Sequence, residues 1–66
     1  QDYTEAFKWY QKSANQGNSL AQYFLGGMYI QGQGIELDKE KAKQLYKKSC
    51  DKGLEESCKK LKEYNF

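Results

Sequence analysis

Two cysteines in the second half of the chain are the residues whose type and spacing point most directly to chemistry. Cys50 closes one amphipathic segment, Cys58 lies early in the next, and Gly53 marks a tight turn between them. On two helices that fold back across such a turn, the cysteine Cα atoms can come within the ~6 Å that a disulfide requires. A bridge around so short a loop would stabilise a small domain by about 2.5 kcal/mol. The spacing therefore predicts a disulfide.

The two cysteines could instead be free thiols or metal ligands. A pair of buried free thiols would suit a cytosolic protein, because cysteine packs as a small apolar residue. A zinc site needs four ligands, and the chain has no histidine and only these two cysteines. We therefore expect no metal and no other cofactor. A disulfide would indicate a periplasmic or secreted protein, whereas free thiols would indicate the cytoplasm.

Ser49 and Lys52 have the S-x-x-K spacing of the nucleophile motif in penicillin-recognising enzymes. The companion S-D-N and K-T-G motifs are absent, and a chain without histidine lacks the commonest general base. A serine on an apolar stripe and a lysine at a helix end also have a structural explanation. We therefore predict that the protein is not an enzyme.

The elements that position these residues come from one pattern written twice. Residues 2–30 and 38–66 align 36 positions apart without a gap and share seven identical residues in 29 pairs. A repeated unit of two helices is typical of an α-solenoid. The first unit is expected to span 1–37, with helices at 2–15 and 18–31 and a loop at 32–37. The second is expected to span 38–66, with helices at 38–51 and 54–64.

Local signals predict the ends and the apolar faces of these helices. Asp2, Asn18 and Asp38 are expected to cap helices, and Gly17 and Gly53 to supply the left-handed turns. The expected apolar stripes are Tyr3, Ala6, Phe7, Tyr10 and Ala14, then Leu20, Ala21, Phe24, Leu25 and Met28, then Ala42, Leu45, Tyr46, Ser49 and Cys50, and last Leu54, Cys58, Leu61 and Tyr64.

Two features lie outside these stripes. Gly26 and Gly27 are costly inside a helix, so they predict a close backbone approach by a neighbouring helix. In the loop that follows, Ile35 is expected to plug back into the core.

The charge of the chain is small and mixed. Eleven lysines oppose nine acids, giving a net charge of +2, and there is no arginine. This disfavours nucleic-acid binding, because arginine is the residue that best reads guanine and phosphate. No apolar run approaches the ~20 residues of a membrane span. The chain begins with Gln1 rather than methionine, so we expect it to be a processed or excised piece of a longer protein.

A family resemblance follows from residues between Ala6 and Ile35. It is carried by Ala6-Phe7-Lys8-Trp9-Tyr10, Ala14, Gly17-Asn18, Ala21-Gln22, Leu25-Gly26-Gly27-Met28-Tyr29 and Gly32-Gln33-Gly34-Ile35. The chain resembles the Sel1-like repeat, a tetratricopeptide-like family, over essentially its whole length. The resemblance implies an all-α solenoid of two repeats with four antiparallel helices, acting as a scaffold or adaptor that binds proteins or peptides. Residues 61–64 depart from the pattern, so the second unit is expected to be the C-terminal capping unit of a longer array.

The second half also resembles the Helicobacter cysteine-rich proteins, whose repeats join their two helices through cysteines at the spacing of Cys50 and Cys58. Ala14 and Gln22 take these places in the first unit, so only one unit would be bridged. Some members of that group are described as binding or slowly hydrolysing β-lactams. Weak β-lactam binding is therefore one alternative function, and a purely structural end cap is another.

Candidate partner-binding residues follow from the groove that stacked repeats leave, which is lined mainly by the first helix of each unit. Trp9 and Tyr23 lie beside the apolar stripes, where exposed aromatic residues can anchor an interface. We expect Trp9 to pack against a neighbouring repeat, because its counterpart Leu45 is apolar. The expected partner is a protein or peptide, or the preceding repeats of the parent chain. The candidate residues are Lys8, Gln11, Lys12, Tyr23, Gln44, Lys47 and Lys48.

Overall fold

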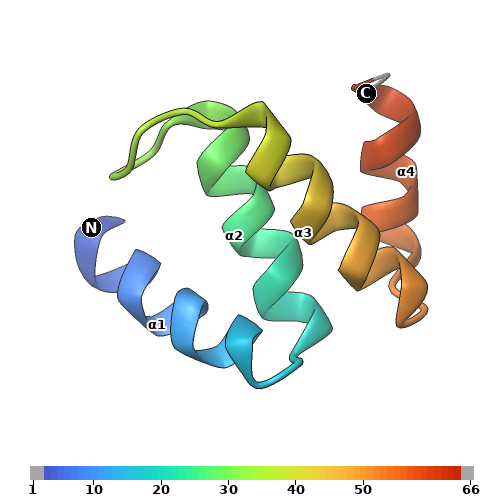
Figure 1. Ribbon diagram of the computed structural model, residues 1–66, viewed down its shortest axis with the longest axis horizontal. Coiled ribbons are helices and arrows are strands. Elements are labelled where there is room, and N and C mark those ends of the chain that lie inside the picture. Colours follow the sequence, from blue (N-terminus) through green and yellow to red (C-terminus); the bar gives the residue numbers. More distant parts are fainter. Residues whose placement is uncertain (1–2, 65–66) are drawn as a thin grey trace.

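The computed structural model describes residues 3–64 as four helices joined by short connections (Figure 1). The helices are α1 (Tyr3–Asn15), α2 (Ser19–Gln31), α3 (Lys39–Asp51) and α4 (Glu55–Glu63). Each helix turns back beside the one before it, and the described part of the chain contains no strand. The predicted all-α fold is confirmed.

Side chains that cap helix starts set where α2 and α3 begin. The side-chain oxygen of Asn18 accepts a hydrogen bond of 3.0 Å from the backbone N–H of Ala21. Asp38 likewise accepts one of 3.1 Å from the N–H of Lys41. Each bond satisfies one of the N–H groups that a helix start leaves without an internal partner. These two predicted caps are confirmed, whereas the predicted cap Asp2 lies outside the described residues.

Glycines turn the chain between the two helices of each unit. Gly17 has a φ of 91° and Gly53 a φ of 100°, in the left-handed region that glycine adopts without steric cost. The N–H of Gly17 donates to the carbonyl of Ala14, and that of Gly53 to the carbonyl of Cys50, each at 2.9 Å. The two aligned segments of the chain therefore turn through similar backbone geometry.

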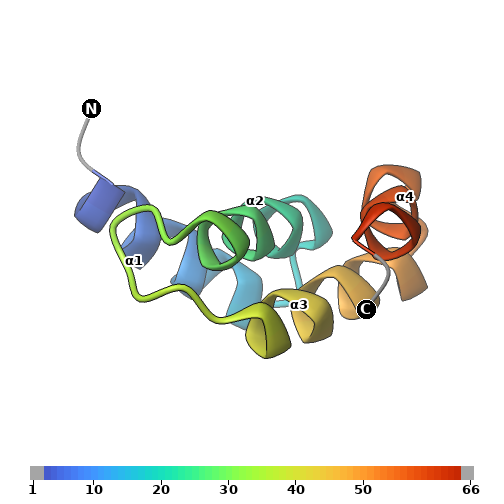
Figure 2. The same ribbon diagram turned by 90° about the horizontal axis from the view of Figure 1, so that it is seen from above.

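Helices α2 and α3 form the central pair of the structure. Helix α2 packs against both α1 and α3, and α4 packs against α3. Seen from above, α2 and α4 lie on one side of α3 (Figure 2). Helices α1 and α4 consequently occupy the two ends of the molecule, with α2 and α3 between them.

The core has two parts that meet at Tyr29. The first consists of Ala14, Ala21, Leu25 and Met28, with partly buried neighbours that include Ile35 and Tyr29. The predicted return of Ile35 to the core is thus confirmed. The second part contains Ile30, Ala42 and Tyr46, with Tyr23, Tyr29 and Leu61 packed against it. The first half of the chain is therefore joined to the second through the packing of α2 against α3.

The predicted apolar stripe of α2 is wrong at two positions. Leu20 is 51% exposed and Phe24 is 43% exposed. Because α2 lies between α1 and α3, two opposite sides of the helix are covered, and Leu20 and Phe24 occupy the strip between them. The residues of α2 that are buried are Ala21, Gln22, Leu25, Gly26, Met28 and Ile30.

The packing corrects one further expectation, on Gly26, and bears on a second, on Trp9. Gly26 makes room for the aromatic ring of Tyr46 rather than for the backbone of another helix. Trp9 is 67% exposed, so it does not pack against another repeat within residues 3–64. Among the described helices, α2 is the one that packs extensively against α1.

Candidate partner-binding surface

The predicted disulfide is present between Cys50 of α3 and Cys58 of α4. The two Cα atoms are 4.8 Å apart, within the range that such a bridge requires. No cysteine is left free. The bridge fastens the last described helix to α3 across the Gly53 turn.

Ser49, Ser57 and Ser19 form a hydrogen-bond relay that explains the serine of the S-x-x-K motif. The hydroxyl of Ser49 donates to the carbonyl of Ser19 at 2.8 Å and accepts a hydrogen bond of 2.6 Å from the hydroxyl of Ser57. Ser49 and Ser57 are both 0% exposed. A hydroxyl that is buried and bonded in this way cannot reach a substrate, so the arrangement supports no nucleophile.

The burial of α4 differs from the apolar face predicted for this helix. Ser57 is the fully buried residue of α4, whereas Tyr64, which follows the helix, is 39% exposed.

The lysine of the S-x-x-K motif has a structural role as well. The Nζ atom of Lys52 donates to the carbonyl of Gly17 at 2.6 Å, which ties the second turn to the first.

Neither a metal centre nor a membrane span occurs in the described part of the chain. Among residues 3–64, no three side chains of the metal-ligating types lie close enough together to hold an ion. None of the four helices combines the length and apolar character needed to cross a bilayer.

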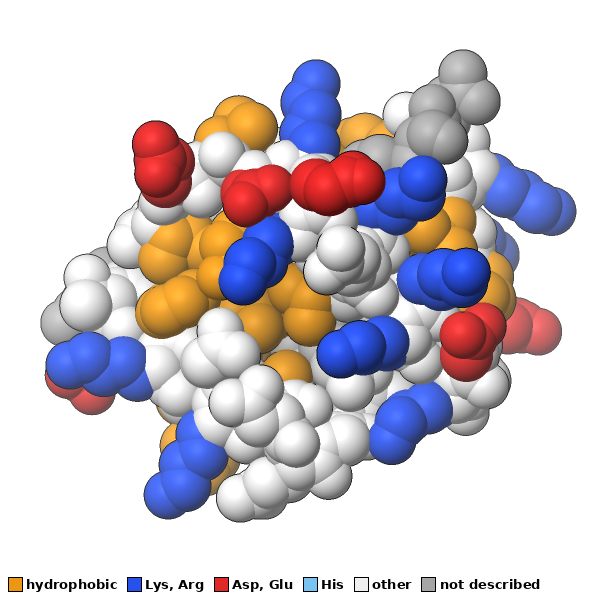
Figure 3. All heavy atoms as spheres, in the orientation of Figure 1, with side chains coloured by type: hydrophobic (Ala, Val, Ile, Leu, Met, Phe, Trp, Pro, Cys, Tyr) orange, Lys and Arg blue, Asp and Glu red, His pale blue; other side chains and the backbone are white. Residues whose placement is uncertain are grey.

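A hollow of about 190 Å³ lies between the first helices of the two units, and we name it the α1–α3 hollow. Its floor is apolar and its walls are polar. Figure 3 shows apolar side chains gathered beside lysines over the region where α1, α2 and α3 meet. The hollow is lined by Leu25, Tyr29 and Leu45, by Gln11 and Asn15 of α1, and by Lys41, Gln44 and Lys48 of α3.

The two walls of the α1–α3 hollow differ in chemistry. On α1, the side-chain amide of Gln11 donates a hydrogen bond of 3.1 Å to the amide oxygen of Asn15. On α3, the Nζ atom of Lys41 lies 6.0 Å from the centroid of the Tyr29 ring. Within residues 3–64, no carboxylate lines the hollow. One wall is thus a pair of neutral amides, and the other is cationic.

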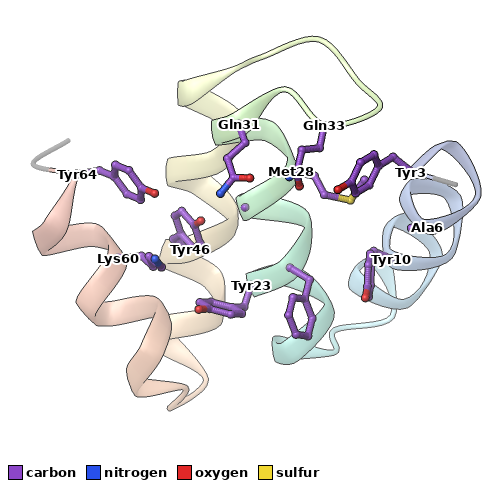
Figure 4. Close-up of a pocket in the computed structure, with 12 residues that line it drawn as sticks. Tyr3, Ala6, Tyr10, Tyr23, Met28, Gln31, Gln33, Tyr46, Lys60 and Tyr64 are labelled. Atoms are coloured by element: carbon purple, nitrogen blue, oxygen red, sulfur yellow. The ribbon is translucent and has the colours of Figure 1, made fainter. Parts of the chain in front are cut away.

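A larger hollow of about 360 Å³ lies over α2 between α1 and α4, and we name it the aromatic hollow (Figure 4). Tyr3 and Tyr10 project into it from α1, and Lys60 and Tyr64 from the α4 side. Its lining is Tyr3, Ala6, Tyr10, Tyr23, Phe24, Gly27, Met28, Gln31, Gln33, Tyr46, Lys60 and Tyr64.

The side chains of the aromatic hollow largely engage one another. The rings of Tyr10 and Phe24 stack with centroids 5.4 Å apart, and those of Tyr46 and Tyr64 stack at 6.4 Å. Burial, followed by the nearby Tyr64, raises the pKa of Tyr46 to about 12. These groups are therefore already partnered within the protein.

The cation of the aromatic hollow is partnered as well. The Nζ atom of Lys60 pairs with a carboxylate oxygen of Glu63 at 3.2 Å, and this hydrogen bond raises the pKa of Lys60.

The structure brings three of the seven predicted partner-binding residues together. Gln11, Gln44 and Lys48 all line the α1–α3 hollow. Their burial differs, because Gln11 is half-buried and the other two are exposed. The three residues come from both first helices, so the hollow depends on the packing of one unit against the other.

The other four predicted residues lie elsewhere. Lys8, Lys12 and Lys47 are exposed on α1 and α3 but do not line either hollow. Tyr23 is half-buried in the aromatic hollow, where its ring centroid is 6.0 Å from that of Tyr46. Tyr23 is therefore separated from the lysine and glutamine candidates.

Sequence reasoning missed two polar residues of the α1–α3 hollow. Asn15 lies four residues after Gln11, and Lys41 lies three residues before Gln44. Residues at these spacings share a face of a helix. Helical spacing applied to the candidate residues would therefore have found both.

Comparison with known proteins agrees with this architecture. The family model described as Sel1 repeat matches residues 1–18 and 19–54, which is most of the chain. No solved structure matches the chain. Sel1 repeats are generally scaffolds for protein interactions, and the longer matched segment, 19–54, spans α2 and α3. The chain belongs to the Sel1 repeat family.

Proposed function

We propose that this chain is a scaffold that binds a protein or peptide, and that the α1–α3 hollow is its binding surface. The observation that carries the proposal is the convergence of Gln11, Gln44 and Lys48 around an apolar floor. Binding sites in proteins combine an apolar lining with a few convergent polar groups. The general role of Sel1 repeats in protein interactions supports the same function.

The size of the hollow favours a peptide segment over a small molecule. Pockets for small molecules typically enclose ~300–1,000 Å³, whereas the α1–α3 hollow encloses about 190 Å³. That volume suits one or two side chains of a longer ligand. The rest of the ligand would lie along the exposed surfaces of α1 and α3, which carry Lys8, Lys12 and Lys47.

Selection of peptides from a random displayed library tests this function. We expect selected peptides to bind the full chain and to shift the backbone NMR signals of α1 and α3 around Gln11 and Lys48. The Gln44→Ala/Lys48→Ala variant should weaken binding. Lys59→Ala is the matched control, because Lys59 is an exposed lysine on α4 that lines neither hollow. Signal changes confined to the aromatic hollow would contradict the proposed site.

A structural end cap is the second candidate function, and the exposure of Trp9 favours it. An indole that is 67% exposed offers a large apolar surface to another repeat of a parent chain. On this view the chain would bind further repeats of a parent protein through α1. NMR titration with those repeats would then shift the signals around Trp9, and library selection would give no peptide that maps to the α1–α3 hollow.

We also propose that the protein works in an oxidising compartment, as a periplasmic or secreted protein. The support is the Cys50–Cys58 disulfide, because such bridges persist where thiols are not continuously reduced. Protein isolated without reductant should resist labelling by a thiol-reactive maleimide until dithiothreitol is added. Labelling of both cysteines before reduction would exclude this location.

A further inference from the structure

The charge that lines the α1–α3 hollow has a single sign. Among residues 3–64, its lining includes Lys41 and Lys48 and no carboxylate, and neither lysine forms an ion pair with another of these residues. The cation of the aromatic hollow differs, because Lys60 is already paired with Glu63. A carboxylate that entered the α1–α3 hollow would therefore meet two ammonium groups available to pair with it.

The two lysines of this hollow have a defined spacing. Lys41, Gln44 and Lys48 occupy positions i, i+3 and i+7 of α3, so they lie along one face of that helix. A helix rises ~1.5 Å per residue, which separates the two lysine Cα atoms by ~10 Å along the axis. A peptide in the polyproline II conformation has three residues per turn and a rise of ~3.1 Å, so side chains three positions apart lie on one side and ~9 Å apart. The two spacings match.

The remaining walls suit the rest of such a peptide. The half-buried floor residues Tyr29 and Leu45 offer apolar contact to a side chain that lies between the two acids, whereas Leu25 beneath them is 1% exposed. Gln11 and Asn15 face them from α1, and amide groups can both donate and accept hydrogen bonds. A polyproline II backbone makes no internal hydrogen bonds, so its N–H and C=O groups are open to these amides.

We infer that the α1–α3 hollow binds an extended acidic segment of a partner protein. Two glutamate side chains three positions apart pair with Lys41 and Lys48, and an apolar side chain between them contacts the floor. The inference rests on the proposed function and adds the chemistry and spacing of the partner. The charge complementarity of the lysine wall selects this occupant over an apolar helix or a basic segment.

Fluorescence anisotropy with short labelled peptides tests the inference on the full chain with its disulfide intact. The probe carries glutamate, leucine, serine and glutamate in that order at its centre, between neutral flanks. We expect the chain to bind it about tenfold more tightly than the same peptide with both glutamates replaced by glutamine. A third peptide places the two glutamates side by side. It should bind severalfold more weakly than the probe, although its charge is the same.

Variants of the chain locate the binding. Lys41→Gln and Lys48→Gln should each lower the affinity for the probe peptide about threefold. The double variant should bind the probe no more tightly than it binds the glutamine peptide. Lys59→Gln, a control on α4, should bind as the unmodified chain does. The replaced lysines are exposed, so circular dichroism and thermal unfolding should show that the variants remain folded.

Failure of the inference differs from failure of the proposed function. One outcome is that library-selected peptides map to the α1–α3 hollow and keep their affinity when their glutamates are replaced by glutamine. In that case the inference of an acidic partner is wrong and the proposed scaffold function stands. Equal affinity for adjacent and spaced glutamates, or for single-stranded RNA, would show a general attraction for polyanions and overturn the spacing. If no peptide of any composition maps to the hollow, both are wrong.

Discussion

Gly26 of α2 lies directly against the buried aromatic ring of Tyr46 of α3. A Cβ atom at Gly26 would be 2.9 Å from Cε1 of Tyr46, closer than real Cβ atoms approach other heavy atoms. Tyr46 is 1% exposed, so its ring is buried beside α2. The adjacent Gly27 differs, because a Cβ there would be 3.7 Å from the Tyr46 hydroxyl, an ordinary contact. The packing therefore requires glycine at position 26 but not at position 27.

Gly26→Ala should lower the free energy of unfolding by about 1 kcal/mol. Forcing a methyl group into a packed core costs ~1–3 kcal/mol, and the higher helix propensity of alanine offsets ~1 kcal/mol of this. Gly27→Ala, the matched control, should raise the free energy of unfolding by up to ~1 kcal/mol through propensity alone. Urea unfolding measures both. An increase in both variants would show that Tyr46 does not pack tightly against Gly26.

Ser49→Ala should lower the free energy of unfolding by about 2 kcal/mol. The replacement leaves the carbonyl of Ser19 and the hydroxyl of Ser57 without their partner in a buried place, which costs ~1–3 kcal/mol. Ser57→Ala should cost less, about 1 kcal/mol, because Ser49 still donates to Ser19. Denaturant unfolding of the two single variants and the double variant separates these effects. Strict additivity would contradict the relay, since bonded residues are energetically coupled.

Reduction of the Cys50–Cys58 disulfide should lower the free energy of unfolding by about 2.5 kcal/mol. The bridge closes a short loop and so restricts the unfolded chain. Helix α4 should respond most strongly, because its packing is to α3. Hydrogen exchange of the reduced protein should therefore show faster exchange in α4 than in α2. The Cys50→Ser/Cys58→Ser variant serves as the control, and its stability should not respond to dithiothreitol.

Stability should fall in alkaline solution through Tyr46. Burial raises the pKa of Tyr46 from 10.0 to about 12 in the folded protein. Below pH 10 both the folded and the unfolded states keep the proton, so the full stability is present. Between pH 10 and pH 12 the unfolded state releases the proton first, and stability falls by ~1.4 kcal/mol per pH unit. Above pH 12 both states are ionised, and Tyr46 causes no further loss.

Tyr46→Phe is the control for this pH dependence. Phenylalanine keeps the ring that packs against Gly26 but has no proton to release. The free energy of unfolding, measured between pH 8 and pH 12, should fall less steeply in the variant than in the unmodified chain. Equal slopes would show that the hydroxyl of Tyr46 ionises as easily in the folded state as in the unfolded state.

The features that the sequence predicted correctly are set by residues close together in the chain. Asn18 and Asp38 cap helices because each bonds to an N–H group three residues away. Gly17 and Gly53 make turns because only glycine adopts their backbone angles at no steric cost. The disulfide belongs to the same class, since a short turn brings Cys50 to Cys58. Such interactions depend on the local chain, so they can be read without knowing the neighbours of each helix.

The features that needed the tertiary structure depend on which side of a helix is covered. Helix α2 carries apolar residues around much of its circumference, so periodicity could not show that α1 and α3 leave Phe24 exposed. The same packing places Tyr23 beside Tyr46 and separates it from Gln11 and Lys48. The sequence by itself determined the helices, their turns and the bridge, because these are local. The fold alone decided which side chains form the α1–α3 hollow, because contacts between distant residues set the exposure of each face.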